Sequence, residues 1–209
     1  MTESIRRALG FEVSRETLDR LSTFEHLLGK WNKAINLVAP STLAEASTRH
    51  IADSAQILRC AETPAEWIDL GSGAGLPGLI IAIISDGEAL GHNVTLVESD
   101  IRKAAFLREA ARATGVKITI ENRRAETLSP ASYDVVSARA LAPISRLLEY
   151  AEPLMADNGI GLFLKGGRHA AEVDEASKRW HFTHETIPSV LDGDGVIVKV
   201  RKPRRVRNR

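Results

Sequence analysis

Apolar residues recur at helical spacing in the first part of the chain. From Ser14 to Ile35 they return every three to four residues, which predicts an amphipathic helix with Ser14 as its N-cap. A second series predicts a helix over residues 41–59, which ends before Thr63-Pro64 because the residue preceding a proline disfavours helical backbone. We expect residues 1–62 to form a helical extension that packs on the rest of the chain.

From Trp67 onward, short apolar runs alternate with helical stretches. Helices are expected to begin at Pro77, Asp100 and Pro143, with another over residues 169–179. This alternation predicts an α/β domain over residues 63–202, with a doubly wound, mostly parallel sheet covered on both faces. No helical pattern separates the last two runs, so we expect them to form an antiparallel hairpin at one edge. The seven expected strands are WIDL (67–70), VTLVE (94–98), VKITI (116–120), YDVVSA (133–138), GIGLFLK (159–165), residues 182–186 and GVIVKV (195–200).

Composition and length indicate one globular domain. The chain has 209 residues, of which 44% are hydrophobic, and no apolar run approaches the roughly 20 residues that cross a bilayer. The first residues also lack the apolar core of a signal peptide. The single cysteine, Cys60, cannot form an internal disulfide and has no neighbours at metal-ligand spacing. We therefore expect a cytoplasmic protein without a metal.

The net charge of +1 conceals an asymmetry. Residues 201–209 (RKPRRVRNR) contain six of the 28 basic residues and no acid, so residues 1–200 carry a charge of +1 − 6 = −5. A basic segment, with its tail over residues 203–209, on a mildly acidic body indicates a polyanionic partner bound through salt-sensitive contacts. A solvated terminus without a partner is the alternative from charge alone.

The strongest local signal is the segment DLGSGAGLPG (69–78), which follows the first expected strand and opens a helix. Glycines allow the sharp turn and let a ligand approach the backbone, since no Cβ lies in the way. Glu98 ends the second strand, 23 residues after Gly75, where a carboxylate can accept hydrogen bonds from both hydroxyls of a ribose. Together these features predict a nucleoside cofactor across the ends of the first two strands.

Two cofactor classes fit the glycine segment. Gly73-x-Gly75-x-x-Gly78 also satisfies the dinucleotide fingerprint, which would make the protein a nicotinamide-dependent (NAD(P)) oxidoreductase. However, the run begins as Asp-x-Gly-x-Gly-x-Gly, the usual methyltransferase form, and seven strands leave no residues for a second catalytic domain. A glycine turn without a ligand is the structural alternative, and the acid in register argues against it. We therefore favour S-adenosylmethionine as the cofactor.

The end of the fourth strand narrows the chemistry. It reads SARA (137–140), without the Asn/Asp-Pro-Pro-aromatic motif common among enzymes that methylate exocyclic amines of adenine or cytosine. No cysteine lies in this region, so the covalent route to C5 of a pyrimidine is also missing. What remains are nucleophiles that need little activation. N7 of guanine is one, because its lone pair lies in the ring plane and carries no proton.

Cations follow the fourth and fifth expected strands. Arg139 and Lys165 are expected at the carboxyl edge, where open parallel sheets bind ligands. The turn over residues 122–126 follows the third strand, where backbone groups of Ala125 and Glu126 could hydrogen-bond the edge of an adenine. From spacing alone, solvated surface charges and an exposed polar turn remain the alternatives.

The expected second helix adds a polar cluster. Asp53 lies three residues from His50 and four from Arg49, so the three share one helical face. Asn36 lies where the first helix ends. An ion-paired helix and an ordinary helix end are the alternatives that spacing alone favours.

Six motifs in one order make the chain resemble a known family. WNKAINLVAP, RHIADS, DLGSGAGLPGL, NRRAE, SARALAP and LKGG span residues 31–167, about two thirds of the chain. This set resembles the bacterial ribosomal RNA small subunit methyltransferase G family, also called glucose-inhibited division protein B. Any one motif could arise by chance, but the ordered set hardly could.

The resemblance implies a class I, Rossmann-like S-adenosylmethionine-dependent methyltransferase that modifies N7 of a guanine in the 530 loop of 16S rRNA. The implied partner is 16S rRNA or the small ribosomal subunit, and the protein is expected to act as a monomer. The implied cofactor-binding residues are Gly71, Ser72, Gly73, Gly75, Leu76, Glu98, Ala125, Glu126 and Arg139. The implied catalytic residues are Asn36, His50, Asp53, Arg139 and Lys165, and those expected to bind RNA are Arg49 and Arg123.

The chain departs from the family pattern at several positions. Val38 stands where the family often has threonine, and only Arg102-Lys103 remain of the basic pair that commonly follows the second-strand acid. Arg204 and Arg205 lie beyond the matched motifs, so their expected RNA binding rests on charge alone. Another RNA or a small molecule is the alternative substrate. A noncatalytic RNA-binding assembly protein is the alternative class, and the intact cofactor segment argues against it.

Overall fold

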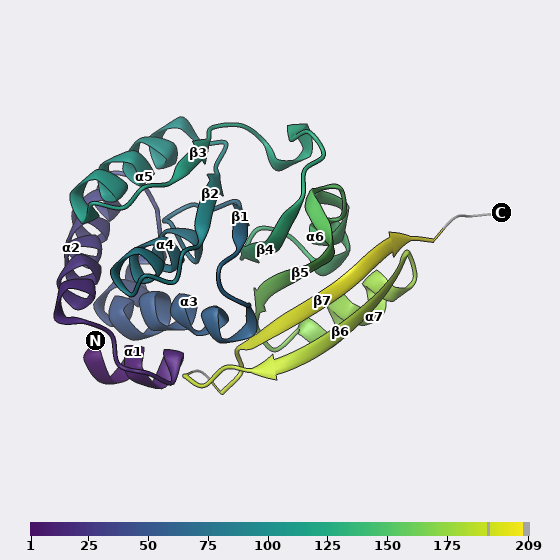
Figure 1. The fold of residues 1–209 in the computed structure, drawn as a ribbon, viewed down its shortest axis with the longest axis horizontal. Helices are drawn as coiled ribbons and strands as arrows, with labels where there is room; N and C mark the ends of the chain where they lie inside the picture. Colours follow the sequence, from purple (N-terminus) through teal and green to yellow (C-terminus); the bar gives the residue numbers. More distant parts are fainter. Residues whose placement is uncertain (192, 207–209) are drawn as a thin grey trace.

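A seven-stranded sheet forms the centre of the molecule (Figure 1). The computed structural model describes residues 1–191 and 193–206. The strand order is β3-β2-β1-β4-β5-β7-β6, and β7 is antiparallel to both of its neighbours while the other pairs are parallel. This confirms the doubly wound sheet and the edge hairpin. The strands are β1 (Glu66–Leu70), β2 (Asn93–Val97), β3 (Thr119–Glu121), β4 (Tyr133–Arg139), β5 (Met155–Lys165), β6 (Trp180–Pro188) and β7 (Val196–Arg205).

Helices cover both faces of the sheet because the strands carry apolar side chains on both sides. In β1, Trp67 points into one hydrophobic cluster and Ile68 into the other, and in β5 Leu162 and Phe163 alternate in the same way. The first cluster packs under α4 and α5, and the second packs under α6 and α7. These helices are α4 (Gly78–Gly87), α5 (Ile101–Thr114), α6 (Ile144–Ala151) and α7 (His169–Ser177).

The N-terminal helices join the first of these clusters. α2 (Arg15–Asn32) begins as expected, with the Ser14 side chain accepting a hydrogen bond from the backbone N–H of Thr17 at 3.1 Å. An additional helix, α1 (Thr2–Leu9), precedes the first one that the apolar pattern predicts and buries three apolar side chains. Its eight residues are too few for periodicity to stand out in the sequence. The residues before β1 therefore extend the core over the face formed by α4 and α5 (Figure 1).

The expectation of one regular helix over residues 41–59 needs correction. Its apolar positions are right, since Ala46, Ile51, Ala55 and Leu58 are buried. The backbone hydrogen-bond pattern, however, changes three times along the segment. One of its turns is π-helical, and π-helical turns are frequent at functional sites. The successive turns are 3₁₀ (Pro40–Glu45), π (Ser47–Ala52), α3 (Asp53–Ala55) and 3₁₀ (Gln56–Cys60).

The C-terminal strand is longer than expected. β7 continues through Arg205, so residues 203–205, expected to begin a basic tail, belong to the sheet. Residues 207–209 of that tail lie outside the described part of the chain. Among the described residues, no helix combines the length and apolar character needed to cross a bilayer.

Candidate functional site

The segment between β1 and α4 forms a tight turn at the carboxyl edge of the sheet, the edge at which the parallel strands end. Gly71, Gly73 and Gly75 all have positive φ, at 65°, 53° and 80°. A Cβ at Gly71 would lie 2.6 Å from the side chain of Leu141, which covers the turn from the end of β4. The positive φ favours glycine at this position, and a larger residue would also displace the Leu141 side chain.

Asp69 holds this turn from below. Its carboxylate is fully buried and accepts hydrogen bonds from the Ser137 hydroxyl at 2.7 Å and from the backbone N–H of Gly78 at 3.2 Å. Burial raises the pKa of Asp69 to about 6, although these hydrogen bonds oppose the shift. Asp69 therefore joins β1, β4 and the start of α4, and it shapes the turn without lining a cavity.

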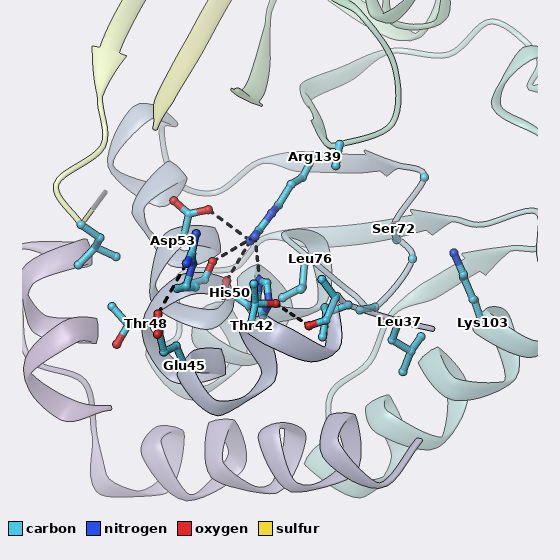
Figure 2. Close-up of a pocket in the computed structure, with 18 residues that line it drawn as sticks. Leu37, Thr42, Glu45, Thr48, His50, Asp53, Ser72, Leu76, Lys103 and Arg139 are labelled. Carbon is cyan, nitrogen blue, oxygen red and sulfur yellow. Dashed lines mark hydrogen bonds and ion pairs between the residues drawn. The ribbon is translucent and has the colours of Figure 1, made fainter. Parts of the chain in front are cut away.

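Two adjoining cavities open at this edge. The larger, of about 740 Å³, lies between the glycine turn and the segment over residues 37–53 (Figure 2). The smaller, of about 290 Å³, lies between the ends of β2, β3 and β4. They share part of their walls, so the two cavities adjoin. The shared lining residues are Gly71, Gly73, Lys103, Arg139 and Ala140.

Glu98 lines the smaller cavity directly after β2. It is 7% exposed, and its two carboxylate oxygens accept hydrogen bonds from the backbone N–H groups of Gly73 at 2.8 Å and Asp100 at 2.7 Å. Each oxygen keeps a second lone pair. Ala125 and Glu126 line the same cavity, as the sequence implied.

Arg139 stands at the boundary of the two cavities. With Arg49, His50 and Asp53 it forms what we call the Arg139 cluster (Figure 2). Its guanidinium lies 3.3 Å from the Asp53 carboxylate and donates to the Arg49 carbonyl at 3.1 Å and to His50 Nδ1 at 2.9 Å. Burial lowers the pKa of Arg139, and Asp53 opposes this shift. An arginine stays charged in such a setting.

The hydrogen bonds of His50 fix its tautomer. Arginine can only donate, so Nδ1 of His50 accepts, and Nε2 carries the proton that it donates to the Thr42 hydroxyl at 2.7 Å. Thr42 in turn donates to the Ala39 carbonyl at 2.8 Å. Burial and the neighbouring cations Arg139 and Arg49 lower the pKa of His50 to about 4. The ring is therefore neutral at physiological pH, and neither nitrogen is free to act as a base.

This lowered pKa predicts a pH-dependent loss of stability. The folded state resists protonation of His50, so its contribution is present above about pH 6.5 and is lost as pH falls toward 4. Between pH 7.5 and 5, we expect the free energy of unfolding of the wild type to fall by about 2 kcal/mol more than that of His50→Gln. Glutamine keeps one acceptor and one donor. The raised pKa of Asp69 stabilises the folded state as pH falls, which opposes the effect of His50, but it does so equally in both proteins. Urea titrations at both pH values measure the difference, and equal losses would contradict the assignment.

The structure does not bring Lys165 or Asn36 to the cavities. Lys165 is 9% exposed at its side chain and donates to the Glu172 carboxylate at 2.7 Å and to the Ala142 carbonyl at 2.6 Å. Glu172 also accepts the backbone N–H of Ile144, so this ion pair holds the loop that leads into α6. Asn36 is exposed beyond the end of α2. Their catalytic roles stay predictions without support from this geometry.

The residues expected to bind RNA are divided between two edges of the sheet. Arg49 lines the larger cavity, and Arg123 lines the smaller one, 3.0 Å from Glu121. Arg204 and Arg205 lie at the far end of β7, beside the start of β5, because β7 runs antiparallel to β5. They are therefore at the edge opposite the two cavities.

Sequence reasoning missed three residues that shape or line the cavities. Asn32 is buried, and its amide oxygen accepts the backbone N–H groups of Leu37 and Val38, both at 2.9 Å. Gln56 donates to Asp53 at 2.7 Å and accepts from the backbone of the β6–β7 loop. Tyr150 lines the smaller cavity. The sequence does contain signals for two of them, because Asn32 lies in the WNKAINLVAP motif and Gln56 follows Asp53 by three residues.

Comparisons with known proteins agree on one family. The family model described as rRNA small subunit methyltransferase G (GidB) matches residues 17–197. A relative from Ruegeria sp. is 46% identical over 201 residues, covering 96% of this chain and 98% of the relative. Another, from Parvibaculum lavamentivorans, is 50% identical over 192 residues, covering 90% and 84%. Both are named ribosomal RNA small subunit methyltransferase G.

Solved structures agree on the fold. A ribosomal protein L11 methylase from Lactobacillus delbrueckii subsp. bulgaricus superposes with a TM-score of 0.60 at 14% identity, covering 74% of this chain and 79% of that one. A TehB-like SAM-dependent methyltransferase from Corynebacterium glutamicum gives a TM-score of 0.57 at 13% identity, covering 87% and 99%. The fold is therefore that of class I methyltransferases, and the sequence matches show that this chain belongs to the ribosomal RNA small subunit methyltransferase G (GidB) family.

Proposed function

We propose that this protein transfers a methyl group from S-adenosylmethionine to N7 of a guanine in the 530 loop of 16S rRNA. Family membership favours a methyltransferase over the oxidoreductase that the glycine pattern also allowed. The observation that carries the proposal is the pair of adjoining cavities with Arg139 at their boundary. A cofactor in one cavity and a base in the other would meet at this residue.

The lining of the smaller cavity fits S-adenosylmethionine. Glu98 offers carboxylate lone pairs for the two ribose hydroxyls, and Ala125 and Glu126 offer backbone groups for the adenine edge. A Cβ at Gly73 would not clash with the protein, since its nearest neighbour would be the Gly71 carbonyl oxygen at 3.7 Å. It would instead occupy cavity space that glycine leaves open. When bound, S-adenosylmethionine supplies an electrophilic methyl group on a sulfonium.

The Arg139 cluster supports a nucleophile that needs no base. Both nitrogens of His50 are engaged, and the Asp53 carboxylate accepts from Gln56 while it pairs with Arg139. A 2′-hydroxyl or an exocyclic amine loses a proton during methylation, whereas N7 of guanine does not. We infer that the cluster orients the base and excludes water, and that positioning supplies most of the rate enhancement. Arg139 is a donor suited to guanine O6, which leaves the N7 lone pair free to attack the methyl group.

Lys103 is the other cation at the boundary. It lines both cavities and, within the described part of the chain, forms no ion pair, whereas Arg139, Arg49 and Arg123 each have an acidic partner. We propose that Lys103 binds a phosphate beside the target base. One chain supplies every residue named here, so we propose that the enzyme acts as a monomer. We also propose that it acts in the cytoplasm, where its ribosomal substrate is found.

Substitution of the nucleophilic atom tests the proposal. We expect 16S rRNA transcribed with guanosine to accept labelled methyl, and the same RNA transcribed with 7-deazaguanosine to accept none, because carbon replaces N7. A matched control is RNA transcribed with inosine, which lacks the exocyclic amine but keeps N7 and should still be methylated. Transfer to the 7-deaza RNA would move the reaction to another atom.

A further inference from the structure

The far end of the β6–β7 hairpin carries a group of exposed cations. Arg201, Lys202, Arg204 and Arg205 are exposed, and Pro203 between them is buried. Within the described residues, none of the four forms an ion pair, unlike Arg6, which pairs with Glu3 on its own helix. We call these four residues the distal basic edge. Unpaired cations at one edge attract a polyanion.

A bulge aims two of these arginines at one face of the sheet. Arg201 lies opposite Thr183 and Arg204 opposite His181, although three steps separate the arginines and only two separate their partners. The extra residue is accommodated near Lys202, which has a φ of 50°. Residues two apart in a strand share a face, so Thr183 and His181 lie on the same face. Arg201 and Arg204 are paired with these two residues across the bulge, so they lie on that face as well.

This face is open to solvent. The opposite face of the hairpin packs against α6 and α7 through Trp180, Val198 and Val200. On the open face, Ile197 is the last β7 side chain in the core, Lys199 donates to the Cys60 carbonyl at 2.8 Å, and Ile160 of β5 is buried opposite Arg201. Beyond that point His181, Thr183, Arg201 and Arg204 are all exposed. The open end of the hairpin, where β6 begins and β7 ends, also lies away from α1 and α2 (Figure 1).

The distal basic edge is far from the two cavities. Val196 begins β7 opposite Lys165 at the carboxyl edge, and the strand ends nine residues later at Arg205. At roughly 3.3 Å per residue, β7 is about 30 Å long. An RNA that reached both places would have to span a distance on the order of ten stacked base pairs.

We infer that the distal basic edge is a second RNA-binding surface, which contacts the phosphate backbone remote from the methylated base. This inference rests on the proposed function. It specifies that the substrate of the enzyme is a large folded RNA rather than an isolated stem-loop or nucleotide. Glu152 and Asp157 line the depression beside Lys202 and Arg204, so the phosphates approach over the face with His181 and Thr183. Neither acid forms an ion pair with these cations among the described residues.

The test compares two RNAs and three variants. The RNAs are full-length 16S rRNA and a short stem-loop containing only the 530 loop. The variants are Arg201→Gln with Arg204→Gln, the charge-preserving Arg201→Lys with Arg204→Lys, and a control, Arg6→Gln with Arg7→Gln, that also removes two exposed charges from α1. RNA affinity is measured across a salt series, together with kcat/KM on each RNA and the Kd for S-adenosylmethionine.

For the glutamine pair we expect affinity for full-length RNA to fall about tenfold, and the salt slope to decrease by about 1.4 to 1.8, or 0.7 to 0.9 per lost contact. The lysine pair and the control should bind like the wild type. Activity on the stem-loop and cofactor affinity should not change. If the glutamine pair lost the same affinity for both RNAs, or none for the long one, the inference would be overturned. It would also be overturned if the glutamine pair lost binding to anionic phospholipid vesicles while its RNA binding stayed intact.

Binding is measured without catalysis, so the two proposals fail separately. If no RNA is methylated but the long RNA still depends on Arg201 and Arg204, the distal surface stands and the proposed function fails. If methylation occurs and the glutamine pair binds normally, the proposed function stands and the distal surface fails.

Discussion

Glu98→Ala is expected to raise the Kd for S-adenosylmethionine by about a hundredfold or more. The substitution removes the carboxylate to which the two ribose hydroxyls would donate, and a hydrogen bond to a charged group is worth about 1.5 to 3 kcal/mol. It also removes the acceptor that holds the backbone N–H of Gly73 at 2.8 Å, so the glycine turn loses a support. Calorimetric titration with the cofactor measures the change.

A conservative variant and a surface variant control this prediction. Glu98→Gln keeps the size and one acceptor but loses the charge, and we expect an intermediate Kd. Glu175→Gln changes an exposed acid of α7 that pairs with Lys178 just after the helix, and its Kd should equal that of the wild type. A Glu98→Ala protein that binds the cofactor normally would remove Glu98 from the ribose site.

Arg139→Ala is expected to lower kcat by at least about a hundredfold, with a much smaller change in cofactor affinity. It removes the donor at the boundary of the cavities and leaves Asp53, His50 Nδ1 and the Arg49 carbonyl without their partner. Both side chains of the Asp53–Arg139 pair are about one-fifth exposed, so we also expect a loss of about 3 kcal/mol in the free energy of unfolding. Rates should be measured where the variant is fully folded.

Two further substitutions separate catalysis from stability. Arg139→Lys keeps the charge but loses the planar fork of donors, and it should restore stability better than it restores kcat. Asp53→Asn removes the ion-pair partner while Arg139 remains, so it should cost stability with a smaller loss of kcat. If all three variants lose activity only in proportion to their unfolded fraction, Arg139 is structural and not catalytic.

Much of the fold could be predicted because its signals are local. Each strand is a short apolar run, and each helix repeats at its own period, so their alternation alone indicates a parallel sheet. The glycine turn and Glu98 were also visible, since both follow directly from strand ends. The cluster of His50, Asp53 and Arg139 needed the family resemblance, because Arg139 is distant from the other two in sequence.

What could not be predicted depends on contacts between distant segments. Lys165 ends a strand as expected, but Glu172 on α7 binds it, and nothing in the sequence marks that pairing. Asn32 and Gln56 act through backbone groups of loops whose path periodicity does not describe. Because β7 runs antiparallel to β5, Arg204 lies at the edge of the sheet opposite the cavities. The bulge at Lys202 determines which face of the sheet carries the Arg204 side chain.

The most direct test of the central claim is to incubate the purified protein with methyl-labelled S-adenosylmethionine and unmodified small ribosomal subunits or their precursor RNA, and to map the labelled nucleotide. We expect a single labelled guanine in the 530 loop, recovered as 7-methylguanosine. Label on another nucleotide, or no label when cofactor binding has been confirmed separately, would contradict it.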